Sequence, residues 1–141
     1  MRSLCLLIAA ALLGFQVGCV DREQDILGSW QAVRVGEQPT EGQQTQSLKI
    51  NADKTYALTS PGRKVSGTWV WMGDRISLTP TKLNDMSFTD ARRAWADQGR
   101  NPDDVDASAE PTYLTFDKES KVLHVLDASG SPTVLEFHRA V

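Results

Sequence analysis

From Ile26 onward the chain consists of short runs of alternating apolar and polar residues, separated by turn residues. Such alternation places one face of a strand against a core and the other face in water. Each run is five to eight residues long, which is the usual length of a β-strand. The expected strands cover residues 29–35, 47–51, 55–60, 65–72, 75–79, 112–117, 121–127 and 133–139.

The breaks between these runs are rich in Asn, Asp, Gly, Pro and Ser, which adopt or cap tight turns. Eight short strands with tight connections predict an all-β domain, most simply a small antiparallel meander closed into a β-barrel. A two-sheet β-sandwich would show the same alternation, so it remains the alternative. The turns are expected at residues 51–54, 61–62, 73–74, 117–120 and 128–132.

The segment between the fifth and sixth expected strands is too long for a hairpin turn. Ser87 can cap a helix, with Asp90 as its acidic partner three residues later, and Gly99 is a typical helix stop. Residues 101–104, Asn-Pro-Asp-Asp, form a second helix-start pattern. We therefore expect a helical insertion near residues 84–110.

Residues 1–18 have the pattern of a signal peptide. Arg2 gives a positive start, and residues 4–13 form an uncharged apolar run of ten residues. That run is shorter than the roughly 20 residues needed to span a membrane, and its length is typical of a signal-peptide core. The small Gly18 stands directly before Cys19.

Residues 17–19, Val-Gly-Cys, resemble the lipobox of bacterial lipoproteins, although Gln16 stands where Leu is usual. The resemblance implies cleavage before Cys19 and attachment of a lipid such as palmitate to Cys19. Val20, in place of an Asp directly after Cys19, implies the outer membrane rather than the inner one in a cell with two membranes. The alternative is an ordinary signal peptide cleaved nearby, which would release a soluble protein.

The mature chain then comprises a short polar tether at residues 19–25 and one domain at residues 26–141. Its length suits a single core that hides about two-thirds of the unfolded surface. Cys5 leaves with the signal peptide, so Cys19 has no disulfide partner. The net charge changes from −3 to −4 when Arg2 is removed, and no basic cluster indicates a nucleic-acid partner.

Gly28 and Trp30 open the first expected strand, and Arg139 ends the last. This arrangement resembles the lipocalin-like (calycin-type) group of small barrels, which implies that Arg139 lies against the Trp30 ring and closes the barrel floor. Such a stack of a guanidinium on an indole contributes about 0.5 to 2 kcal/mol. The insertion and the short strands depart from that group's pattern, which argues against a deep ligand cavity.

Trp69 and Trp71 are two residues apart on one strand and therefore face the same side. Burial is favoured, because two exposed indoles would form a large apolar patch. With Tyr56 and Leu58 they either line a cavity for a small apolar ligand, with the helix around Trp95 as a lid, or fill the barrel as core.

Other candidate sites are weaker. His124 and His138 can lie on neighbouring strands, but the sequence offers no further ligands at metal-site spacing. Residues 104–108 match the start of a calcium loop only in part, since Ala109 stands at the required Gly. The sequence has no catalytic triad motif, nucleotide loop or zinc signature.

We therefore expect a lipid-anchored cell-envelope protein without enzymatic activity or cofactor. Its barrel binds a small apolar molecule or an envelope protein, and the alternative is a structural or interaction module with a filled core.

The lipobox-like residues give the first testable prediction. Cys19→Ser removes the acylated side chain, so the variant is expected to leave the membrane fraction or to accumulate uncleaved, as measured by fractionation and mass spectrometry. A wild-type protein that is already soluble would contradict the prediction.

Overall fold

The computed structural model describes residues 22–34 and 46–140. Residues 1–21, 35–45 and 141 lie outside this part, and with them the predicted signal peptide and Cys19. The strands are β1 (Gly28–Arg34), β2 (Ser47–Ile50), β3 (Thr55–Ser60), β4 (Arg63–Met72), β5 (Arg75–Leu83), β6 (Met86–Ser87), β7 (Thr112–Asp117), β8 (Val122–Leu126) and β9 (Pro132–Arg139). The helices are α2 (Phe88–Asp97) and α3 (Asp103–Ser108).

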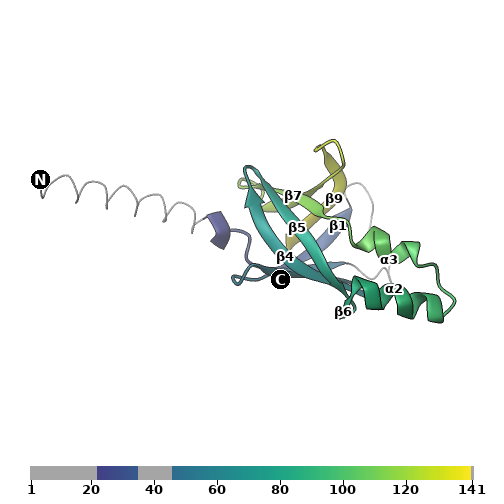
Figure 1. The fold of residues 1–141 in the computed structure, drawn as a ribbon. Coiled ribbons are helices and arrows are strands. Elements are labelled where there is room, and N and C mark those ends of the chain that lie inside the picture. The colour runs from purple at the N-terminus through teal and green to yellow at the C-terminus, as the bar shows by residue number, and fades with distance from the viewer. Residues whose placement is uncertain (1–21, 35–45, 141) are drawn as a thin grey trace, which may run out of the picture.

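Eight of the strands form one closed antiparallel barrel (Figure 1). Neighbours follow the order β4, β3, β2, β1, β9, β8, β7 and β5, and the pairing of β4 with β5 completes the ring. β6 is an extra short strand that pairs with the end of β5. The predicted β-barrel is confirmed, and a ring of hydrogen-bonded strands excludes the two-sheet sandwich.

Strand β5 is longer than the expected strand at residues 75–79, which stops before Pro80 because proline is disfavoured inside a sheet. Instead the strand continues to Leu83, and Pro80 lies opposite Gly67 at a register shift between Ser66 and Gly67. The residue left without a ladder partner at this shift is Thr81, and the irregular pairing beside it tolerates a proline that lacks an N–H. The β4–β5 hairpin therefore extends beyond the barrel.

The long insertion folds into the two predicted helices. Ser87 caps α2 by accepting a hydrogen bond from the Asp90 backbone N–H at 3.2 Å. Gly99, with φ of +72°, ends the helix, and the Arg100 N–H donates to the Trp95 carbonyl at 2.9 Å. This is the Schellman arrangement that a glycine after a helix favours.

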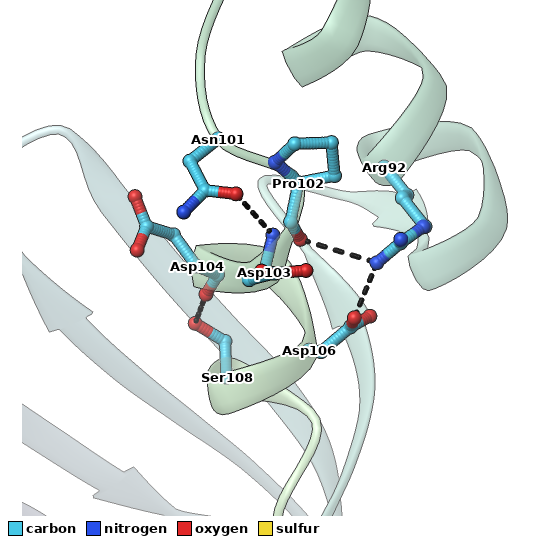
Figure 2. Close-up of polar contacts among 7 residues, drawn as sticks. All are labelled: Arg92, Asn101, Pro102, Asp103, Asp104, Asp106 and Ser108. Carbon is cyan, nitrogen blue, oxygen red and sulfur yellow. Dashed lines mark hydrogen bonds and ion pairs between the residues drawn. The ribbon is translucent and has the colours of Figure 1, made fainter.

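Helix α3 begins after Asn101, whose side-chain oxygen accepts from the Asp103 N–H at 3.1 Å (Figure 2). Arg92 of α2 forms an ion pair with Asp106 of α3 and joins the two helices. No helix in the described ranges has the length and hydropathy needed to cross a membrane.

The apolar side chains form two clusters. The larger fills the barrel: Ile26, Trp30, Leu48, Ile50, Tyr56, Trp69, Ile76, Leu78, Leu114, Leu123 and Phe137. The smaller joins the insertion to the extended hairpin: Val65, Leu83, Ala91, Trp95 and Val105. Leu58 is half-buried and packs against both clusters. The helices are therefore anchored on the hairpin extension by apolar contacts, with Ala91 and Trp95 as the buried face of α2.

Gly67 supplies the second prediction, because a Cβ at this position would lie 2.0 Å from the Thr79 carbonyl oxygen. The obstacle is backbone, so relief requires the strands to move apart. Gly67→Ala is expected to destabilise the fold by about 1 to 3 kcal/mol, as overpacked sites commonly do. Thermal unfolding monitored by circular dichroism measures this. The neighbouring Ser66→Ala is the control, and equal melting temperatures for the two variants would contradict the expectation.

Candidate functional site

The two ends of the barrel differ. One end carries the start of β1, the end of β9 and the turns after β2, β4 and β7; we call it the Arg139 end. The other carries the β5 extension with α2 and α3; we call it the helix end. The residues predicted to close the barrel lie at the Arg139 end.

Trp30 and Arg139 face each other across the β1–β9 pair. The Trp30 side chain is fully buried, and its indole N–H donates to the Ile26 carbonyl at 2.9 Å. The Arg139 guanidinium carbon lies 4.1 Å from the centre of the Trp30 ring. The cation thus covers a ring that is already fixed by its own hydrogen bond.

Arg139 also binds the segment that enters β1. Its guanidinium donates to the carbonyls of Asp25, at 2.7 Å, and Leu27. Gly28 leaves the space for this contact, because a Cβ there would lie 2.8 Å from Nη1 of Arg139. Its φ of +116° is also a conformation that other residues rarely adopt. The structure therefore brings Gly28, Trp30 and Arg139 together as one contact.

Three more cations lie over aromatic rings at the same end. Such contacts contribute about 0.5 to 1 kcal/mol each at exposed positions. They are Arg22 over Trp71 at 3.7 Å, Lys54 over Trp69 at 4.3 Å and Lys121 over Phe116 at 5.9 Å from the ring centroids. Together with Arg139 they cover the Arg139 end with cations that shield ring faces from water.

Residues 22–25 belong to the predicted tether, and they contact the barrel. Residues 22–24 are helical. The Arg22 guanidinium donates to the Gly73 carbonyl in the β4–β5 turn, and Glu23 forms an ion pair with Lys54 in the β2–β3 turn. Sequence reasoning missed these contacts, because local spacing says nothing about which turn lies beneath a preceding segment.

The four predicted ligand-binding residues have different surroundings. Tyr56 and Trp69 are 3% and 2% exposed, and burial raises the pKa of the Tyr56 phenol. The Trp69 indole N–H donates to the Asn51 carbonyl at 2.8 Å. Leu58 packs between the two clusters, and Trp71 is half-buried beneath Arg22. Tyr56 and Trp69 therefore belong to the packed core.

Trp71 differs from Trp69 in its hydrogen bonding. The Nε1 atom of Trp71 is buried and has no hydrogen-bond partner among the described residues, and the same holds for Trp95 in the smaller cluster. A buried donor of this kind is costly without an acceptor. Among the predicted ligand-binding residues, Trp71 thus has a buried indole N–H without an acceptor in the described part of the chain.

The two histidines share one carboxylate on neighbouring strands. His124 of β8 lies opposite Glu136 of β9, with 3.4 Å between Nδ1 and Oε1. His138 lies 2.9 Å from the other oxygen of Glu136 through its Nε2. Glu136 and His138 are two residues apart on a strand, a spacing from which this contact could have been predicted. Within residues 22–34 and 46–140, no group of three His, Cys, Asp or Glu residues could hold a metal ion.

Comparison of the chain with protein-family models, curated proteins and solved structures found no match.

The Arg139 contact gives the third prediction. Arg139→Ala removes the cation from Trp30 and the donors from two carbonyls, so we expect a loss of about 1 kcal/mol or more and a melting temperature lower by several degrees. Arg139→Lys keeps the charge but not the planar pair of donors, so an intermediate value is expected. A wild-type melting temperature for Arg139→Ala would show that this contact does not hold the barrel end.

Proposed function

We propose that the protein is a lipid-anchored lipoprotein of the cell envelope whose lipocalin-like barrel is a non-enzymatic interaction module. The anchor is supported by the apolar run at residues 4–13 and by Val17-Gly18-Cys19. In this proposal the lipid on Cys19 holds the protein at a membrane, by preference the outer membrane in a cell with two membranes. The barrel then acts on a partner at that membrane.

The observation that carries the interaction role is the filled interior. Eleven buried side chains form one cluster inside the barrel, and Trp30 and Trp69 each direct an indole N–H to a backbone carbonyl. Side chains that are packed and hydrogen-bonded in this way belong to the core. A partner would therefore be bound by the outer surface of the barrel. A barrel of eight short strands is filled by its own side chains in many small folds, which is consistent with this reading.

The outer wall offers apolar side chains for such recognition. Val70, Ser77 and Tyr113 lie in register across β4, β5 and β7. Val70 is 51% exposed and Tyr113 36% exposed, while Ser77 between them is buried. Exposed apolar and aromatic side chains such as Val70 and Tyr113 can take part in a surface that binds another protein.

Two of the exposed carboxylates are engaged in turns. The Thr55 hydroxyl lowers the pKa of Asp53 by hydrogen bonding to its carboxylate, and Ser129 does the same for Asp127. Both aspartates cap turns. A carboxylate whose pKa is lowered in this way is a poor general acid or base near neutral pH.

A second candidate function is the binding of a small apolar or amphipathic molecule, and the unpartnered Trp71 N–H favours it. A ligand that placed an acceptor beside Nε1 would satisfy this donor. Because Tyr56 and Trp69 are packed, the ligand would reach only the Trp71 side of the core, and its affinity would be low.

The fourth prediction separates these two functions. Tryptophan fluorescence is titrated with fatty acids, phospholipids and small aromatic compounds. A filled interaction module is expected to give no saturable change. A saturable change that disappears in Trp71→Phe and persists in Trp95→Phe would instead establish the ligand-binding function. Trp95→Phe is a matched control, because its indole N–H is also buried without a partner but lies in the other cluster.

A further inference from the structure

The chain enters the barrel domain at a fixed place. Arg22 stacks on Trp71 and binds the Gly73 carbonyl, and Glu23 pairs with Lys54. Ile26 is fully buried in the barrel core. These contacts reach two different turns of the Arg139 end. Residues 22–26 are therefore clamped against this end of the barrel.

The clamp leaves little chain between the barrel and Cys19. Only Val20 and Asp21 separate Cys19 from Arg22. Three residue steps span at most about 11 Å when fully extended. A lipid on Cys19 would therefore hold Arg22, and with it the Arg139 end, within about one headgroup layer of the bilayer surface.

We propose that the protein stands on the bilayer with its Arg139 end against the lipid headgroups and its helix end pointing away. This inference rests on the proposed lipid anchor and adds an orientation to it. The partner of the Arg139 end is thus the membrane surface, whereas α2, α3 and the hairpin extension are presented to the surrounding compartment.

The separation of the two ends makes the orientation measurable. Strand β5 has nine residues, which corresponds to about 30 Å when extended. Figure 1 shows α2 and α3 at the end of the barrel opposite to the start of the described chain. Asp74, in the turn contacted by Arg22, and Gln98, at the end of α2, are both exposed and mark the two ends.

The test uses the lipidated full-length product in vesicles of phosphatidylethanolamine and phosphatidylglycerol that carry an energy-transfer acceptor on the headgroup. Asp74→Cys and Gln98→Cys each introduce one thiol for the same donor dye, because Cys5 is removed and Cys19 is acylated in the proposed mature form. Transfer is expected to be several times higher from position 74 than from position 98.

The control variant carries Arg22→Ala and Glu23→Ala in both labelled backgrounds. Loss of the clamp is expected to leave sedimentation with vesicles intact. The difference in energy transfer between the dyes at positions 74 and 98 is expected to shrink. If the difference persists, the clamp is not what orients the domain, and this part of the inference is wrong.

Failure of the orientation and failure of the anchor give different results. Protein that sediments with vesicles but transfers equally from both positions overturns the orientation and leaves the anchor standing. Protein that does not sediment and shows no transfer from either position overturns both.

Discussion

The stack of Arg139 on Trp30 connects the first strand, the last strand and the segment that enters the barrel. It joins the first and last strands of the ring, and its donors reach the carbonyl of Asp25, 114 positions earlier in the chain. Trp30 in turn binds the Ile26 carbonyl, so the entering segment is fixed from both sides. Arg139 therefore holds the segment at Asp25 and Leu27, while Arg22 and Glu23 hold it at two turns of the same barrel end.

Local patterns in the sequence predict much of the fold, because they are sufficient to locate strands, turns and helix ends. Ser87, Gly99 and Asn101 act at the helix ends as their residue types indicate. Pro80 shows the limit of such reasoning. By its residue type alone, Pro80 predicts the end of a strand. A register shift next to its partner Gly67 accommodates it, and this shift depends on the pairing of two strands.

The candidate site is predictable only in part for the same reason. Gly28, Trp30 and Arg139 lie together as expected, since strand pairing brings the chain ends side by side. The different roles of Trp69 and Trp71 are not visible in the sequence. Both face inward, yet only Trp69 reaches the carbonyl of Asn51, because the β2–β3 turn lies beside it. The stacking of Arg22 and Lys54 on these rings likewise depends on tertiary packing.

Ring closure between β1 and β9 also protects the edges of the sheet. Residues 30–34 and 135–139 pair across almost the whole domain, so this pairing closes a long loop and carries a corresponding loss of chain entropy. Until β9 pairs with β1, β1 has an unpaired edge and Trp30 lacks the cation that covers it. An edge left open in this way invites pairing with other chains. Pairing of β9 with β1 therefore removes an edge that other chains could otherwise extend, and the closed ring protects the domain from aggregation by this route.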